Sequence, residues 1–289
     1  MVVIACVVAA GVVVGTVAGL LARRFPLLEA PKLAETTVAA EVQRHPKAAS
    51  FLERRRDPAA LTGLVLTLAV GLIVVGVAGL GVLVVMIRSK RGLASFDLRL
   101  ATFAADHATE LSTDVLRAIS WFGGTAGAIV VALVVLVIEY RRLPSRALVG
   151  FLVLCVAGQF GLSNLIKLVV DRARPDIDQL TGFASTSFPS GHATAAAAVL
   201  AACAFLLGRQ RTMRTKALLA GVAAGLAACV GATRIFLGVH WFTDVVAGLL
   251  LGWAWFAICS IAFGGRLLRF GAPVETAEHQ ASLEEARSG

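Results

Sequence analysis

Long runs of apolar residues dominate the chain, and short polar segments separate them. A helix that crosses a bilayer needs about 20 apolar residues, within a range of about 17 to 25. The shortest run, 217–233, still reaches that length, and the longest, 60–87, is long enough to require tilt. The pattern predicts seven membrane helices, at residues 2–22, 60–87, 121–139, 147–168, 191–208, 217–233 and 241–263.

The composition agrees with a polytopic membrane protein of the all-α class. Charged residues make up only 16% of the chain and the mean hydropathy is +0.83, whereas soluble domains carry about 25% charged residues. The five cysteines lie inside the apolar runs without CxxC spacing, so we expect small buried side chains that form neither disulfides nor metal sites. We divide the chain into an N-terminal transmembrane helix and cytoplasmic linker (1–58), a membrane core (59–264) and a disordered cytoplasmic tail (265–289).

The net charge of +9 reflects membrane topology and does not indicate a nucleic-acid partner. If the N-terminus is outside the cell membrane, 18 of the 27 Lys and Arg residues fall on the inside, in segments 23–58, 140–146, 209–216 and 264–289. This bias predicts a multi-pass protein of the inner membrane with its N-terminus out and its C-terminus in. Residues 1–22 lack the basic start of a signal peptide, so we expect an uncleaved helix.

Two longer polar segments connect the predicted helices. Segment 23–58 shows no pattern that indicates chemistry. Segment 88–120 alternates apolar residues with acidic ones such as Asp97 and Asp106, which predicts an amphipathic helix with a solvated face. A role in lining the entrance to a site is the alternative.

A first polar cluster ends the predicted helix 147–168. Lys167, Arg172 and Arg174 place three cations within eight residues on the face that the positive-inside bias disfavours. Such charges can be anchors at the membrane surface. Because topology opposes them here, an anionic partner is the better explanation.

A second cluster, Pro189-Ser190-Gly191-His192, opens the next apolar run. Ser190 is a preferred N-cap residue and Gly191 allows a ligand to approach the backbone. The first turn of a helix presents unpaired N–H groups to an anion, and His192 could transfer a proton there. An ordinary helix cap is the alternative.

A third cluster contains Arg234, His240 and Asp244. His240 and Asp244 are four residues apart and share a helix face, so the carboxylate can fix the tautomer of the imidazole and leave its other nitrogen as a nucleophile. With the other clusters, this provides what phosphoryl transfer through a histidine requires. No cluster of carboxylates suggests a magnesium site, so we expect cations in place of a metal and no cofactor.

In this order and spacing the three clusters resemble the motifs of the type 2 phosphatidic acid phosphatase superfamily, which also contains glucose-6-phosphatase and vanadium haloperoxidases. The resemblance covers about residues 60–263 and implies a six-helix phosphatase core with one additional N-terminal helix. It implies that His240 is the nucleophile, that Asp244 orients it and that His192 is the general acid. Thr233 stands where the family more often has serine, which leaves its phosphate contact open. The implied phosphate-binding residues are Lys167, Arg174, Ser190, Gly191 and Arg234.

The resemblance implies a metal-independent membrane phosphatase that acts at the outer face on a lipid phosphate or diphosphate. Phosphatidic acid, phosphatidylglycerol phosphate and polyprenyl diphosphate are the candidate substrates. Two other functions use the same cations: a non-catalytic phospholipid-binding scaffold, and a transporter for an anionic solute. A transporter would need polar residues along its spans, and few occur beyond Gln159, Ser163 and Asn164.

Overall fold

The computed structural model describes residues 1–24, 58–183, 185–209 and 211–268. Every regular element in these ranges is a helix, which confirms the all-α class. Most of the predicted linker and tail lie outside the described residues. The helices are α1 (Val2–Arg24), α4 (Pro58–Ser89), the 3₁₀ helix η1 (Gly92–Phe96), α5 (Asp97–Asp106), α6 (Glu110–Trp121), α7 (Thr125–Arg142), α8 (Arg146–Val170), α9 (Gly191–Leu207), α10 (Met213–Phe236) and α11 (Phe242–Leu268).

Each predicted apolar run forms a helix. Among the described helices, α1, α4, α8, α10 and α11 are long and apolar enough to cross a membrane by themselves. Helices α6 and α7 meet at a bend of 49° and pass the same test only as a pair, as a broken span or a re-entrant loop. Helix α9 has 17 residues, which at 1.5 Å per residue is about 26 Å, near the thickness of the hydrocarbon core. The third predicted span starts later than expected, at Thr125, because the chain turns at Gly123 and Gly124.

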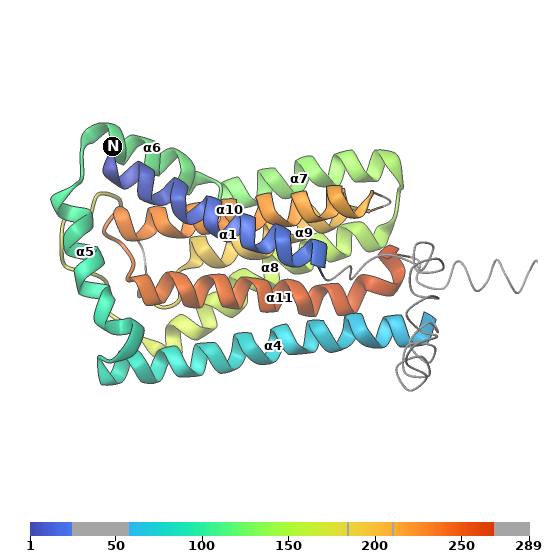
Figure 1. Cartoon of the computed structure of the whole chain (residues 1–289), viewed down its shortest axis with the longest axis horizontal. Coiled ribbons are helices and arrows are strands. Elements are labelled where there is room, and N and C mark those ends of the chain that lie inside the picture. Colours follow the sequence, from blue (N-terminus) through green and yellow to red (C-terminus); the bar gives the residue numbers. More distant parts are fainter. Residues whose placement is uncertain (25–57, 184, 210, 269–289) are drawn as a thin grey trace, which may run out of the picture.

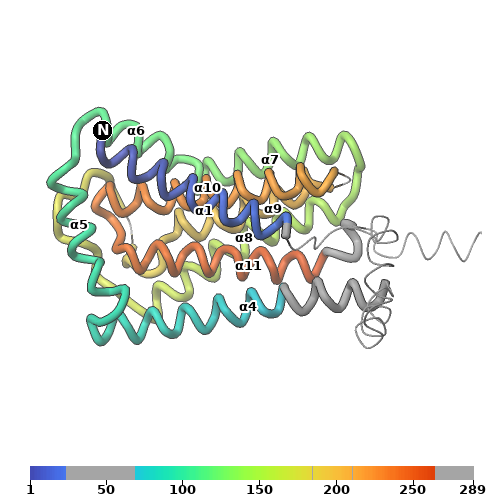
Figure 2. Tube along the Cα trace, viewed as in Figure 1, coloured from blue at the N-terminus to red at the C-terminus, as the bar shows by residue number. Residues whose placement is uncertain are grey.

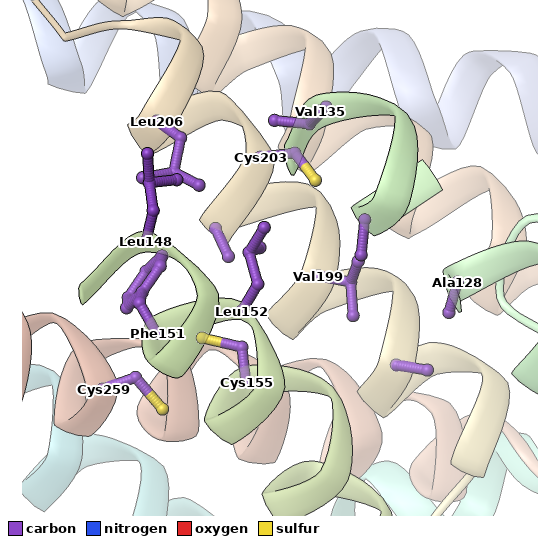
Figure 3. Packing of buried hydrophobic residues seen from close by; sticks show 13 residues of the cluster. Ala128, Val135, Leu148, Phe151, Leu152, Cys155, Val199, Cys203, Leu206 and Cys259 are labelled. Carbon is purple, nitrogen blue, oxygen red and sulfur yellow. The ribbon is translucent and has the colours of Figure 1, made fainter. Parts of the chain in front are cut away.

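Helix α9 lies at the centre of the bundle and packs against α7, α8, α10 and α11 (Figure 1). Its first half is rich in buried alanine, and such small side chains let neighbouring helices approach closely. Figure 3 shows the packing beyond that half, where Phe151 of α8 and Val199 of α9 are fully buried. Cys155, Cys203 and Cys259 are free thiols in this cluster, as the sequence predicted for buried cysteines.

Glycines bring two pairs of helices into backbone contact. A Cβ atom added to Gly248 of α11 would lie 2.6 Å from the carbonyl oxygen of Ser190, so α11 touches the start of α9. On the other side, Gly11 and Gly15 of α1 meet Gly221 and Gly225 of α10 at similarly short distances. Helix α1 is therefore closely packed on the bundle, against the helix that carries Arg234.

We expect Gly15→Leu to destabilise the protein. A Cβ at this position would lie 2.7 Å from the Gly221 carbonyl oxygen, so the two helices must separate, at a cost of about 1–3 kcal/mol. Thermal unfolding in detergent should show a lower Tm. Gly81→Leu on α4 is the matched control, because a Cβ there meets no atom within 4 Å. Equal Tm values for the two variants would contradict the packing.

One end of the bundle gathers the loops that carry the three polar clusters. Segments 169–183, 185–190 and 234–240 lie at the same end as the N-terminus, where α5 crosses the ends of the long helices (Figure 2). Val3 and Val7 of α1 are fully buried there and belong to the same apolar cluster as Phe236 and Val239. The segments that carry the polar clusters therefore share one end of the bundle, as the sequence predicted.

Candidate active site

The candidate site is built from the ends of four helices. Lys167 lies in the last turn of α8, Gly191 is the first residue of α9, and Arg234 lies in the last turn of α10. His240 lies in the turn that joins α10 to α11. Each of these polar residues thus lies within about one turn of a helix end, and the apolar interior of the bundle begins on the other side of the site.

Arg174 connects the loop after α8 to the proposed nucleophile. Its Nε donates to the carbonyl oxygen of Ser185 at 2.7 Å, and its Nη1 donates to that of Val239 at 2.6 Å. The same Nη1 lies 3.2 Å from Nε2 of His240. This arrangement suits an Nε2 that carries no proton and accepts from the guanidinium, and it places a fixed positive charge beside that nitrogen.

Two further cations are buried around this point. Lys167 is 8% exposed, and its Nζ donates to Ser185 Oγ at 3.0 Å and to the Thr186 carbonyl oxygen at 2.8 Å. Arg234 is 5% exposed, and its Nη1 donates to Ser120 Oγ at 2.7 Å. Neither makes an ion pair with a carboxylate among the described residues. Buried cations of this kind are expected to bind an anion.

Several buried polar atoms at the site lack a partner within the described part of the chain. They are Nε of Arg234, Nδ1 of His240 and the hydroxyls of Ser163 and Ser190. The backbone of Gly191 is also open, because a Cβ added there would meet only Ser163 Oγ, at 4.0 Å. Since leaving a buried polar group unpaired costs about 1–3 kcal/mol, these atoms favour a polar ligand at the start of α9.

His240 and Asp244 lie close together as predicted, but not on one helix face, because His240 is in the turn before α11 and only Asp244 is in the helix. Nδ1 of His240 is 3.6 Å from Oδ2 of Asp244, slightly beyond hydrogen-bond length, and such catalytic contacts commonly shorten when a substrate binds. Burial lowers the pKa of His240 to about 4, Asp244 opposes this shift, and Arg174 and Arg234 add to it. The imidazole is therefore neutral at physiological pH, as a nucleophile must be.

His192 follows Gly191 in the first turn of α9 and faces the same group of charges. A Cβ added to Gly124 would lie 3.6 Å from its Nε2, and one added to Gly123 would lie 2.6 Å from its carbonyl oxygen. The bend between α6 and α7 therefore packs directly against this histidine. Four ionisable side chains lie close enough to act electrostatically on the His192 imidazole: Arg234, His240, Arg174 and Lys167.

A buried network behind His240 was not predicted from the sequence. Arg172, which had no assigned role, donates from Nη1 to Asp244 Oδ1 at 2.6 Å and from Nη2 to Asp97 Oδ2 at 2.7 Å. Asp97 was expected on the solvated face of a surface helix, which is wrong: it is 4% exposed. Its Oδ1 also accepts from the backbone N–H of Thr243 at 2.9 Å.

Two hydroxyl groups near the site were considered from the sequence: Ser190 as a helix cap, and Thr233 as a phosphate contact that was left open. Ser190 occupies the N-cap position of α9, but its side chain makes no capping hydrogen bond, and its backbone N–H instead donates to the Asp244 carbonyl oxygen at 3.0 Å. The Thr233 hydroxyl donates to the Val230 carbonyl oxygen of its own helix at 2.6 Å. That bond occupies its proton and gives no support for a phosphate contact.

The turn before His240 depends on a glycine. Gly238 has a φ of 71°, in the left-handed region that favours glycine. A Cβ there would also lie 2.5 Å from the Asp178 carbonyl oxygen, and Leu180 N–H donates to the Leu237 carbonyl oxygen at 3.0 Å. The loop after α8 is thereby held against this turn.

Within the described ranges, no group of three or more His, Cys, Asp or Glu side chains is placed to hold a metal ion. The positive charge at the site is supplied by Lys167, Arg174 and Arg234, each of which the sequence had singled out.

Comparison with known proteins identifies relatives among lipid phosphatases. The chain is 37% identical over 127 residues to phosphatidylglycerophosphatase B of Bacillus subtilis, and the match covers 42% of this chain and 61% of that protein. It is 39% identical over 107 residues to lipid A 1-phosphatase of Rhizobium johnstonii, covering 34% of this chain and 40% of the relative.

Two other matches extend over almost the whole relative. The chain is 31% identical over 187 residues to decaprenylphosphoryl-5-phosphoribose phosphatase of Mycobacterium tuberculosis, which covers 62% of this chain and 95% of that protein. A crystal structure of a transmembrane PAP2-type phosphatidylglycerolphosphate phosphatase from Bacillus subtilis has the same fold, with a TM-score of 0.60 and 24% identity. It covers 68% of this chain and 98% of its own.

The family model of the PAP2 superfamily matches residues 147–267, a range that contains all three polar clusters. Together with the match across nearly the full length of the mycobacterial relative, this shows the family. The chain belongs to the PAP2 superfamily.

Proposed function

We propose that the protein is a membrane phosphatase that hydrolyses a lipid phosphate or diphosphate through a phosphohistidine intermediate. The observation that carries this proposal is the contact of Arg174 Nη1 with Nε2 of the buried His240. It places a guanidinium, which binds phosphate oxygens, directly beside a neutral imidazole nitrogen that can attack phosphorus.

In the first step, the hydrogen bond from Arg174 Nη1 moves from His240 Nε2 to a phosphate oxygen, the freed Nε2 lone pair attacks the phosphorus atom, and the bond from phosphorus to the lipid oxygen breaks. His192 donates a proton to the departing oxygen, and Asp244 accepts the hydrogen bond of the Nδ1–H. In the second step, His192 removes a proton from a water molecule, which attacks phosphorus and breaks the P–N bond. This releases inorganic phosphate and restores His240.

The phosphate group is held by fixed donors. Lys167, Arg174 and Arg234 provide charge for its oxygens, and the open backbone at Gly191 provides N–H groups at the start of α9. The Ser190 hydroxyl is a further donor, since it is buried without a partner in the described structure. These groups do the work that a metal ion does in other phosphatases, so we propose that activity needs no metal and no cofactor.

The position of the site suits a lipid substrate. It lies at the ends of membrane-spanning helices, where lipid headgroups lie, and the named relatives act on phosphatidylglycerophosphate, lipid A and a decaprenyl-linked phosphate. Phosphatidic acid, phosphatidylglycerol phosphate and polyprenyl diphosphate are therefore the candidate substrates. The Lys and Arg bias supports an inner-membrane protein with this site on the extracytoplasmic face.

The test is phosphate release by purified protein in detergent with EDTA present, against the three candidate lipids in parallel. Release from at least one lipid is expected, and a His240→Ala protein should release none. Activity that disappears in EDTA and returns with magnesium would contradict the metal-free site. If wild-type protein binds these lipids but releases no phosphate, the scaffold is favoured, and uptake of inorganic phosphate into proteoliposomes would indicate transport.

The low pKa of His240 predicts an unusual pH profile. An ordinary histidine with a pKa of about 6.5 would lose its free nitrogen just below neutrality. With a pKa near 4, His240 stays unprotonated to lower pH, so kcat/KM should fall only as the pH drops through about 4. The acid limb of kcat/KM between pH 3.5 and 8 reports this group in the free enzyme together with the second ionisation of the free phosphate substrate, whose pKa is about 6. The substrate is therefore titrated separately, and a limb near pH 6.5 that remains after its ionisation is subtracted would contradict the prediction.

A further inference from the structure

We propose that Asp97 is a positioning residue of the reaction, acting through Arg172 and Asp244 to fix the tautomer of His240. Asp97 lies on α5, well outside the three motifs, and outside the residues matched by the family model. The inference rests on the proposed function, because it concerns the nucleophile of that function.

Both carboxylate oxygens of Asp97 accept hydrogen bonds. Oδ1 accepts from the Thr243 backbone N–H at 2.9 Å, and Oδ2 accepts from the Thr243 hydroxyl and from Arg172 Nη2, both at 2.7 Å. Its side chain is 5% exposed and that of Arg172 is 15% exposed. A carboxylate so thoroughly hydrogen-bonded and shielded has one well-defined orientation.

Arg172 connects this carboxylate to a second one. Its Nη1 donates to Asp244 Oδ1 at 2.6 Å while its Nη2 contacts Asp97, and its guanidinium carbon lies 5.4 Å from the centre of the Trp241 ring. A planar guanidinium presents donors in a rigid fork. The position of Asp97 therefore determines where Arg172 holds Oδ1 of Asp244.

The other oxygen of Asp244 is the one that faces His240. Oδ2 accepts from Ser187 Oγ at 2.6 Å and from the Trp241 backbone N–H at 3.0 Å, and it lies 3.6 Å from His240 Nδ1. Because Arg172 fixes Oδ1, the carboxylate cannot rotate without losing that bond. Nδ1 has no hydrogen-bond partner within the described residues, so the network favours the Nδ1–H tautomer by holding an acceptor oxygen 3.6 Å away, where a small movement would close the bond and leave Nε2 without a proton.

The negative charge of Asp97 affects how strongly Arg172 attracts the Asp244 carboxylate. One guanidinium between two carboxylates leaves Asp244 only partly neutralised, so its remaining negative charge is available to His240. Without the charge of Asp97, the buried guanidinium would depend on Asp244 alone and draw that carboxylate away from the imidazole. An asparagine would also direct its NH2 group at a donor in either orientation, toward Arg172 or toward the Thr243 backbone N–H.

Asp97 could instead serve only as a helix cap, since it accepts from Thr243 in the first turn of α11. The variants Asp97→Asn and Arg172→Lys separate the two roles. Arg172→Lys keeps the charge and leaves the bond from the Thr243 backbone N–H to Asp97 in place, although it removes the bond that Arg172 Nη1 donates to the Thr243 hydroxyl at 2.7 Å. An ammonium cannot bridge the two carboxylates with the geometry of a guanidinium. Asp106→Asn is the matched control, being the same change on an exposed residue of the same helix.

The experiment measures the His240 imidazole directly. Side-chain nitrogen NMR of ¹⁵N-histidine-labelled full-length protein, with the His240 signals assigned by their loss in His240→Gln, reports the tautomer without any substrate. We expect the Nδ1–H form to dominate in wild type and in Asp106→Asn, and to lose population in Asp97→Asn and in Arg172→Lys.

Kinetics provide the second measurement. Each of the two variants should lower kcat by about tenfold to 100-fold, as when a catalytic group is displaced by about 1 Å, while KM stays within about twofold because neither side chain contacts the phosphate. In an Asp244→Asn background, Asp97→Asn should reduce kcat by less than about twofold further, since its effect passes through Asp244.

The outcomes distinguish this inference from the proposed function. An unchanged His240 tautomer in Asp97→Asn and Arg172→Lys would overturn the inference, whatever the activity. A tautomer shift only in Asp97→Asn, with losses that add to those of Asp244→Asn, would assign Asp97 to helix capping and also overturn it. A wild-type protein that releases no phosphate would contradict the proposed function, while the imidazole signals would still decide whether Asp97 fixes His240.

Discussion

Replacing His240 with alanine is expected to lower kcat for phosphate release by about 10⁶-fold, the order of loss seen when a covalent nucleophile is removed. The described contacts of the side chain are with Arg174 and Asp244, which have other partners, so the fold should survive. Thermal unfolding and gel filtration in detergent should match the wild type. The measurement is phosphate release from the preferred lipid at saturation.

The matched control is His107→Ala. This histidine lies at the same end of the bundle but is exposed, stacked on Phe103, and its loss should leave kcat within about twofold, as for most surface changes. Residual activity in His240→Ala above about 1% of the wild type would rule out the phosphohistidine route. Rapid quenching of wild type with ³²P-labelled lipid should also trap label on the protein, with the acid lability of a P–N bond.

The second large effect is expected for Arg174→Lys, which should lower kcat/KM by about 100-fold to 1000-fold, as when one preorganised donor to a transition state is lost. Lysine preserves the charge, but it cannot donate at once to the carbonyl oxygens of Ser185 and Val239 and to Nε2 of His240, as Arg174 does. The turn that carries the nucleophile would lose its connection to the loop after α8.

Arg141→Lys is a suitable control, because Arg141 is exposed in the last turn of α7, at the opposite end of the bundle. Steady-state kinetics of both variants on the same lipid decide the matter. If Arg174→Lys retained more than about a third of the wild-type kcat/KM, charge alone would suffice and the role assigned to the guanidinium fork would be wrong.

The bundle could be predicted from the sequence because a bilayer imposes a length on each apolar run. The runs at 191–208 and 217–233 are the two shortest, yet they form α9 and α10 as expected. The break between α6 and α7 was missed, since Gly123 and Gly124 occur in a chain with 28 glycines and nothing local distinguishes them. Their importance comes from the packing of His192 against them.

The candidate site was predictable to the extent that its residues lie within local motifs. Lys167, Arg174, Arg234, His192 and His240 are brought together by the helix ends that the motifs mark. Asp97 could not be found in this way, because 75 residues separate it from Arg172 and its own neighbours show the pattern of a surface helix. The sequence also did not predict that the Ser163 hydroxyl lies at the site, because only the packing of α8 beside Gly191 brings it there.

The contact between α1 and α10 has a consequence for biogenesis. Helix α1 is made first among the described helices, but the glycines that it packs against follow about 200 residues later. At synthesis rates of about 5–20 residues per second, α1 waits roughly 10 to 40 s in the bilayer before its partner emerges. During that interval the surface of α1 around Gly11 and Gly15 can contact other helices. Translation speed and early chaperoning should therefore influence how much of the protein assembles correctly.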